Sequence, residues 1–102
     1  MIAIDSEKLK AIINHYGHTT QFNKTVEELS ELIRALVRDD KDNLIEEMAD
    51  VYIMLEQLLI ICDISDEVID YLIYQKIERT LERMNKDDQK CSSKCVISNK
   101  FI

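Results

Sequence analysis

Proline is absent from this chain of 102 residues, and the only glycine is Gly17. Tight β-hairpins rely on glycine at positive φ, so a chain with so little of it is unsuited to an all-β fold. Collagen-like and low-complexity chains are excluded for the same reason. Isoleucine, leucine, glutamate and lysine dominate instead, and most of these residues favour helices. The sequence therefore predicts an all-α protein, and its length predicts a single domain.

Basic residues are also in the minority, with 13 lysines and arginines against 20 aspartates and glutamates and a net charge of −7. A nucleic-acid backbone needs a cationic surface, so DNA and RNA polymers are not expected as partners. The most apolar stretch, residues 51–64, contains Glu56 and is too short to span a membrane. The chain shows no secretory signal and has an odd number of cysteines, so we expect reduced thiols and a cytoplasmic protein.

Apolar residues recur at helical spacing through most of the chain. This spacing predicts four helices, over about residues 6–16, 22–38, 43–62 and 66–84. Gly17 is expected to end the first helix. Asn43 and Glu46 have the spacing of a capping pair for the third helix, and Ser65 is the expected cap of the fourth.

The helical pattern is lost towards the end of the chain. We therefore predict one domain over residues 1–84 and a tail over residues 85–102. Cys91 and Cys95 lie in this tail, and no further ligands accompany them in a strong zinc pattern. No metal site is expected there.

Each predicted helix has an apolar side. These sides consist of Leu9, Ile12, Ile13 and Tyr16 in the first helix, Phe22, Val26, Leu29, Ile33 and Leu36 in the second, and Val68, Tyr71, Leu72, Ile77, Leu81 and Met84 in the fourth. The second half of the third helix, residues 58–62, is apolar nearly all round, and such a helix is buried on every side. We therefore expect a four-helix bundle-like subunit that assembles as a homodimer or homotetramer.

Two pairs of acidic residues are the most informative feature of the sequence. Glu28 and Glu31 in the second helix are three residues apart, as are Glu47 and Asp50 in the third, so each pair shares one side of its helix. Consecutive antiparallel helices pack with their axes about 8–10 Å apart. The two pairs can therefore face each other across a hairpin and meet around metal ions.

The surroundings of the second pair support this interpretation. On a helical wheel, Glu47 and Asp50 fall at the edge of an apolar stripe that contains Val51, Met54, Leu58 and Ile61. Carboxylates removed from water need a partner, and no nearby basic residue of this helix provides one. Clustered carboxylate oxygens suit Mg²⁺, or Mn²⁺ as a substitute. The sequence therefore predicts a metal site formed by Glu28, Glu31, Glu47 and Asp50.

Other interpretations of the acidic residues are open. Most acidic pairs on helices are solvated, and Thr25 with Glu28 also has the spacing of a capping box for a helix that begins later. The alternative is therefore a non-catalytic helical dimerisation or regulatory module with solvated acidic clusters. A ferritin-like di-iron site is excluded, because it needs two Glu-x-x-His motifs and neither His15 nor His18 follows a glutamate at that distance.

The acidic residues also resemble the signature of a known enzyme family. Glu27-Glu28-x-x-Glu31, followed after a gap of fifteen residues by Glu47-x-x-Asp50, is similar to the motif of the MazG-like, all-α nucleoside triphosphate pyrophosphohydrolases. The sequences of residues 26–32 and 46–51 read like those of family members, and residues 74–79 resemble the basic stretch of their last core helix. The resemblance covers about residues 20–84.

This resemblance implies Mg²⁺-dependent cleavage of a nucleoside triphosphate between its α and β phosphorus atoms. The two acidic pairs would hold the metal, and the general base would be Glu27 or the least committed metal-site glutamate, for which Glu28 is the candidate. The residues that would bind phosphate are Lys76, Arg79, Arg83 and Lys24. The base and sugar of the substrate stay open, because relatives acting on phosphoribosyl-ATP or on deoxynucleotides would show the same carboxylates.

Overall fold

Helices make up almost all of the part of the chain that this computed structural model describes, residues 4–90, with Lys90 described by its backbone alone. In chain order the helices are α1 (Ser6–Tyr16), α2 (His18–Arg38), α3 (Lys41–Ile61) and α4 (Asp66–Lys90). No strand occurs within residues 4–90, so the prediction of an all-α protein is confirmed. The chain divides after Ile64 into a unit that contains α1, α2 and α3 and a unit that contains α4.

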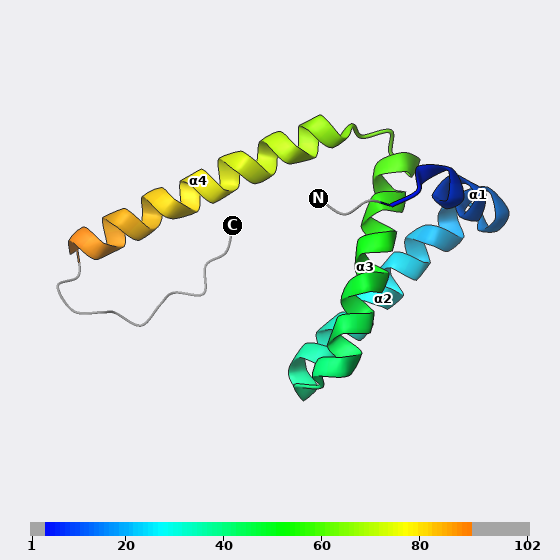
Figure 1. Cartoon of the computed structure of the whole chain (residues 1–102), viewed down its shortest axis with the longest axis horizontal. Helices are drawn as coiled ribbons and strands as arrows, with labels where there is room; N and C mark the ends of the chain where they lie inside the picture. Colours follow the sequence, from blue (N-terminus) through cyan, green and yellow to red (C-terminus); the bar gives the residue numbers. More distant parts are fainter. Residues whose placement is uncertain (1–3, 91–102) are drawn as a thin grey trace. The chain divides into compact units, whose positions relative to one another are not determined.

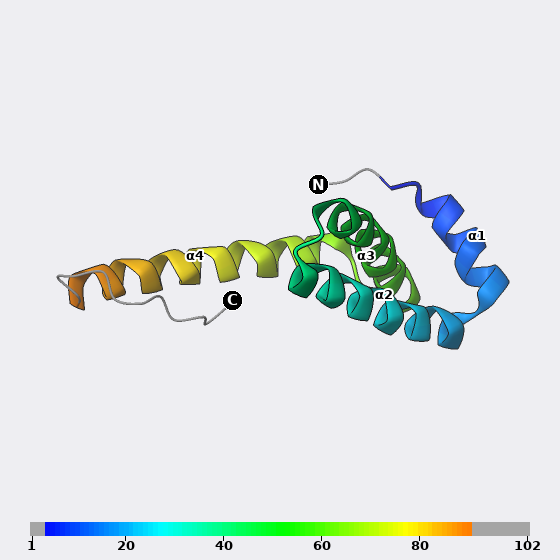
Figure 2. The ribbon, with the colours of Figure 1, turned by 90° about the horizontal axis from the view of Figure 1, so that it is seen from below.

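Asp5 and Gly17 define the two ends of α1. The Asp5 carboxylate accepts a hydrogen bond from the backbone N–H of Glu7 at 3.0 Å and caps the helix. Gly17 has φ +89°, a conformation that glycine adopts without strain, and its N–H donates to the carbonyl of Ile13 at 2.7 Å. Gly17 therefore ends α1 as predicted, and the chain turns sharply there into α2 (Figure 2).

Three helix boundaries differ from the prediction. Helix α2 begins at His18, four residues before the expected start, because Gly17 both ends α1 and precedes the first turn of α2. The second difference is the start of α3, at Lys41. The Asp40 side chain caps this helix by accepting a hydrogen bond from the N–H of Asn43 at 3.2 Å, so the predicted capping role of Asn43 and Glu46 is wrong.

The third difference concerns α4. It continues for six residues beyond Met84 to Lys90, so the prediction that the helical pattern ends at residue 84 is wrong. The added residues are polar and include neither glycine nor proline, so nothing in their sequence stops a helix. The two cysteines of the predicted tail, Cys91 and Cys95, lie outside the described residues.

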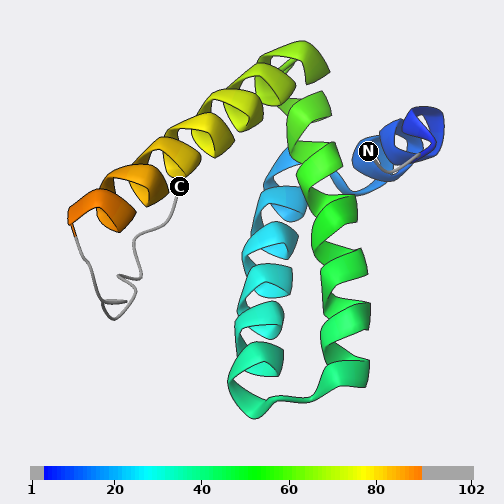
Figure 3. The ribbon, with the colours of Figure 1, turned by 60° about the vertical axis from the view of Figure 1, so that its left-hand side comes forward.

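Helices α2 and α3 form an antiparallel hairpin, which is seen most clearly in Figure 3. Only Asp39 and Asp40 connect them, and Asp39 adopts a left-handed conformation with φ +55°. At the opposite end of the hairpin α1 packs against both helices (Figure 1), with Leu9 and Ile13 buried. The hairpin thus has a closed end at residues 39–40 and an open end beside α1.

The side of α2 that faces the interior of the hairpin is mainly polar. Its buried residues are Gln21, Thr25, Glu28 and Ala35. The apolar stripe from Phe22 to Leu36 is instead between 40% and 64% exposed, because neither α1 nor α3 covers it. The interior of the hairpin is therefore not the apolar core that the sequence pattern of α2 favours.

Other predicted apolar sides are also uncovered. On α1, Ile12 and Tyr16 are exposed, and all six apolar residues named above for α4 are exposed as well. Residues 58–61 of α3 are half-buried within the single chain, and Cys62, which follows the helix, is exposed. The predicted burial of this segment on every side depends on a second subunit and stays a prediction. Within residues 4–90, none of the helices has the length and hydropathy that a membrane-spanning segment needs.

Candidate metal centre

Three of the four predicted metal ligands come together between α2 and α3. Glu28 from α2 and Glu47 and Asp50 from α3 each offer an oxygen, and these atoms lie within 4.8 Å of one another. Glu28 is 5% exposed and Glu47 is 9% exposed, whereas Asp50 is half-buried. The antiparallel hairpin brings the acidic residues of its two helices to the same level, and the three-residue spacing points Glu47 and Asp50 to the same side of α3.

The fourth predicted ligand belongs to an adjoining group. Glu27, Glu28 and Glu31 on α2 also offer oxygens within 4.8 Å of one another, and Glu28 belongs to both groups. Glu31 is half-buried and Glu27 is exposed. All five acidic residues of the sequence motif therefore form one continuous cluster, in which Glu28 has the central position.

Two oxygens of this cluster are buried without a partner. The Oε2 atoms of Glu28 and Glu47 have no hydrogen-bond partner among the described residues. Buried polar atoms are almost always paired, because an unpaired one loses its hydration without compensation. Carboxylate oxygens are the ligands that Mg²⁺ and Mn²⁺ prefer, so the donor set and its two unpaired atoms fit such a cation.

The electrostatics of the cluster resist full ionisation. Burial is the largest cause that raises the pKa of Glu28 above its usual value; Lys24 opposes this shift, and Asp50 and Glu31 add to it. Burial likewise raises the pKa of Glu47, and its acidic neighbours, Glu31 first among them, add to this shift. A divalent cation between these carboxylates would favour their charged forms.

Lys24 lies next to the cluster. Its Nζ atom is 3.2 Å from Glu28 Oε1 and 3.3 Å from Glu27 Oε1, one turn away on the same helix. These hydrogen bonds raise the pKa of Lys24, so it carries a positive charge beside the carboxylates. The other predicted phosphate-binding residues lie along α4, where Lys76 is half-buried and Arg79 and Arg83 are exposed.

The capping interpretation of Glu28 is wrong. Because α2 begins at His18, both Thr25 and Glu28 lie inside the helix. The Thr25 hydroxyl donates to the carbonyl of Gln21 at 2.8 Å, one turn back. Glu28 therefore has no role at a helix end, and its burial needs another explanation.

A buried pair of glutamines near the cluster was not predicted from the sequence. Gln21 on α2 donates a hydrogen bond to Gln57 on α3 at 2.7 Å, and both side chains are buried. Each glutamine lies seven residues from a predicted metal ligand on its own helix, Gln21 from Glu28 and Gln57 from Asp50. That spacing places each glutamine on the ligand-bearing side, and it is the signal that indicates their position.

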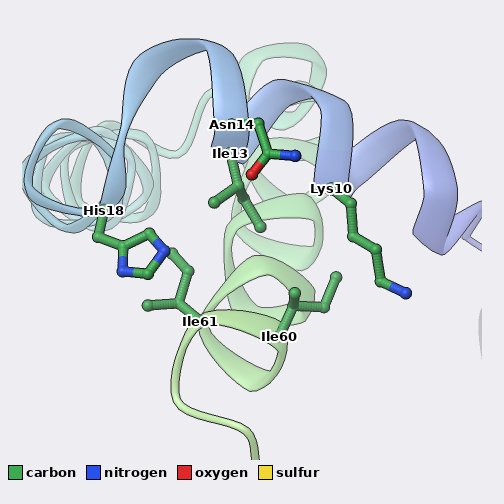
Figure 4. A pocket seen from close by; sticks show the side chains of 6 residues that line it. All are labelled: Lys10, Ile13, Asn14, His18, Ile60 and Ile61. Carbon is green, nitrogen blue, oxygen red and sulfur yellow. The ribbon is translucent and has the colours of Figure 1, made fainter.

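A pocket of about 210 Å³ opens at the open end of the hairpin, beneath α1 (Figure 4). It is lined by Lys10, Ile13, Asn14, His18, Ile60 and Ile61. His18 is ten residues from Glu28 along α2, a distance of about 15 Å in an α-helix. This pocket is therefore separate from the carboxylate cluster.

An antiparallel helical hairpin with buried, unpaired carboxylate oxygens defines a candidate divalent-metal centre in an all-α protein. Comparison with known families agrees with this class. The model of the MazG nucleotide pyrophosphohydrolase domain matches residues 16–92, which include all the predicted site residues, and the chain belongs to this family. No curated protein and no solved structure matches the chain.

Proposed function

We propose that this protein is a Mg²⁺-dependent nucleotide pyrophosphohydrolase. It cleaves a nucleoside or deoxynucleoside triphosphate into the monophosphate and pyrophosphate. This reaction would control the nucleotide pool or remove unwanted nucleotides from it. The observation that carries this proposal is the pair of buried, unpaired oxygens on Glu28 and Glu47 within a cluster of five acidic side chains. Membership of the MazG family supports the choice of reaction.

The metal ligands in this proposal are Glu28, Glu31, Glu47 and Asp50, and Mn²⁺ can replace Mg²⁺. When bound, the cation would neutralise charge on the triphosphate and lower the pKa of the attacking water. This arrangement explains how a protein with a net charge of −7 can bind a still more acidic substrate. The chain has no glycine-rich loop for phosphate binding, so side chains must contribute the remaining contacts.

Glu27 is the first candidate for the general base. It is exposed at the edge of the cluster, so its carboxylate is less committed to the interior than that of Glu28. In this role Glu27 accepts a proton from the water that attacks the α phosphorus atom. Glu28 is the second candidate, because it has the central position in the acidic cluster.

Four basic residues are proposed to bind the phosphates. Lys24 is beside the cluster, and Lys76, Arg79 and Arg83 follow one another along α4 at spacings of three and four residues, which place them on one side of the helix. Positive charges at the β and γ phosphates stabilise the pyrophosphate as it leaves.

The alternative of a non-catalytic helical module receives less support. Solvated acidic clusters would leave the carboxylate oxygens in water, whereas Glu28 and Glu47 are buried. A module that only associates with other helices gives no reason to bury two unpaired oxygens, which costs stability. We therefore favour the enzyme.

We also propose that the enzyme is a homodimer or a homotetramer. The apolar stripe of α2, from Phe22 to Leu36, is exposed. A second apolar surface is a groove of about 430 Å³ between α3 and the residue Ile4, which precedes α1; on α3 it is lined by Ile45, Met48, Ala49, Tyr52 and Ile53. Apolar surfaces of this extent on a small subunit are typical of interaction sites.

The decisive experiment measures pyrophosphate release from a panel of nucleotides, with and without Mg²⁺. The panel contains ribonucleotides, deoxynucleotides, damaged nucleotides and phosphoribosyl-ATP. We expect Mg²⁺-dependent release from at least one of them, and a loss of about a hundredfold or more in Glu47→Ala. Glu46→Ala removes the neighbouring exposed glutamate and is expected to retain activity. Release from none of the nucleotides, or full activity of Glu47→Ala, would contradict the proposal.

A further inference from the structure

A buried amide bridge joins α2 to α3. Gln21 Nε2 donates to Gln57 Oε1 over 2.7 Å, although the two residues are 36 positions apart in the chain. The residues are 5% and 2% exposed, respectively. Gln57 Nε2 also makes a weaker contact with Met54 Sδ at 3.7 Å. Burial of amide groups is unfavourable unless they are paired, so the bridge is a specific contact between the two helices.

The bridge is in register with the carboxylates. Glu28 lies seven residues after Gln21 on α2, and Asp50 lies seven residues before Gln57 on α3. Three residues further in the same directions lie the other members of the two acidic pairs, Glu31 on α2 and Glu47 on α3. Seven residues correspond to about two turns and about 10 Å. One antiparallel pairing therefore places glutamine opposite glutamine and carboxylate opposite carboxylate.

The carboxylates lie between the two ends of the hairpin. The closed end is held by the short connection through Asp39 and Asp40, and the open end contains the amide bridge. Like charges between the helices repel one another and favour separation of α2 from α3. Separation is resisted at the closed end by the chain itself, and at the open end by the bridge together with the packing of α1.

A neutral amide pair suits this position better than an ion pair or an apolar pair. It adds no charge that would compete with the cation or repel it. Its hydrogen bond has a preferred distance and direction, whereas two apolar side chains in contact can slide and rotate. Buried polar contacts of this kind have fixed helix register in other proteins.

We propose that the Gln21–Gln57 bridge is a positioning device for the metal-binding carboxylates. It holds α2 and α3 in the register and rotation that set Glu28 opposite Asp50. Gln21 and Gln57 contact neither the metal nor the substrate and act through the carboxylates. This inference rests on the proposed metal site.

The test compares metal affinity with stability in the full chain. Gln21→Met/Gln57→Met keeps the length of both side chains and removes both amides. Replacing both partners of a buried hydrogen bond is nearly neutral or stabilising, so we expect an unchanged or higher thermal midpoint. We expect the dissociation constant for Mn²⁺, measured by calorimetry, to rise about tenfold or more, as it does when groups that orient metal ligands are lost.

Two further sets of variants separate positioning from a general loss of structure. Each single substitution, Gln21→Met or Gln57→Met, leaves one buried amide unpaired and is expected to lower both stability and Mn²⁺ affinity. Thr25→Val removes a buried hydroxyl whose bond lies within α2, so its Mn²⁺ affinity is expected to stay within about twofold of wild type. Wild-type affinity in the double variant would overturn the inference, whereas absence of Mn²⁺ binding by the wild type would overturn the metal site itself.

The inference can also be tested by hydrogen exchange in the wild-type protein, without any variant. If the bridge favours metal binding, thermodynamic linkage requires that the metal favours the bridge to the same extent. In the ¹⁵N-labelled full chain, Mg²⁺ is therefore expected to slow hydrogen exchange at Gln21 Nε2 about tenfold. The exposed side-chain amide of Gln89 is the internal control and is expected not to change. Equal exchange at Gln21 with and without Mg²⁺ would overturn the inference.

Discussion

The two sides of α2 differ in a way that is the reverse of an ordinary globular helix. The side inside the hairpin carries Gln21, Thr25 and Glu28, which are buried, whereas the stripe from Phe22 to Leu36 is exposed. A helix usually buries its apolar side, because that burial is the main source of stability. The difference shows that packing of this hairpin buries polar and acidic groups, which supports the proposed metal site. The apolar side of α2 stays exposed, and we propose that a second subunit packs there.

The largest expected effect comes from the inner side. Glu28→Gln is expected to lower pyrophosphate release about a hundredfold or more, since it removes the carboxylate shared by both acidic groups. The same variant is expected to raise the thermal midpoint of the metal-free protein by a few degrees, because burial disfavours the charged form of Glu28. Activity assays and thermal denaturation measure the two effects.

Opposite signs of these two effects would distinguish a functional residue from a structural one. Glu46→Gln, at an exposed position of α3, is the control and is expected to change neither quantity. A Glu28→Gln protein that is both active and unchanged in stability would show that the inner side is not specialised for a ligand.

The outer side is expected to give a smaller effect, on assembly. Ile33 is 61% exposed within the apolar stripe, so Ile33→Glu introduces a charge where we propose that subunits meet. Burial of one isoleucine is worth about 1.5–3 kcal/mol, so the subunit dissociation constant should rise about tenfold or more. Light scattering after size-exclusion chromatography measures the change in mass. Arg34→Glu, at the next position and off the stripe, should retain the wild-type assembly, and a monomeric wild type would contradict the proposal.

The smallest expected effect is a pH dependence of stability. The pKa values of Glu28 and Glu47 are raised in the folded protein above the ordinary value of 4.5, so the folded state binds more protons than the unfolded state at pH values above 4.5. Their contribution to stability is complete below that pH and is lost as the pH rises through the folded pKa values. In metal-free protein the thermal midpoint should therefore fall by a few degrees from about pH 4 to about pH 8.

Two comparisons isolate this contribution from that of other acidic residues. The double variant Glu28→Gln/Glu47→Gln should lose the part of the slope that these two groups cause. Saturating Mg²⁺ should flatten the slope in the wild type, because the cation favours the ionised carboxylates. Identical slopes in all three measurements would mean that these carboxylates are hydrated in solution, like those of an outer surface.

Much of the candidate site could be predicted from local patterns. The three-residue spacing of Glu47 and Asp50 places them on one side of a helix whatever the helix packs against. The connection between α2 and α3 is short, so the acidic residues of the two helices had to lie at similar levels in an antiparallel hairpin. Gly17 likewise indicated a helix end from its own conformational freedom, and the structure has that end.

Other features depend on contacts between distant residues and could not be predicted in this way. In α2 the apolar stripe favours burial of one side and the acidic pair favours contact of another side with α3, and only the packing of α2 against α3 shows that the side with Glu28 is the buried one. The cap of α3 depended on the backbone conformation of Asp40, which is extended with φ −98° and ψ 95° and leaves the side chain free to accept from Asn43. The order of polar residues in the turn did not distinguish Asp40 from Asn43 as the cap.

The one-dimensional pattern determined the helical class, the level of the acidic pairs along the hairpin, and the fact that both members of a pair lie on the same side of their helix. All of these are properties of neighbouring residues. Tertiary packing decided which side of α2 faces α3, which carboxylate oxygens lose their hydration, and which glutamine pairs with Gln21. The physical reason is that a helical period relates residues within a few turns. The burial of Glu28 and the Gln21–Gln57 bond depend on two helices that meet only after the chain has reversed at Asp39 and Asp40.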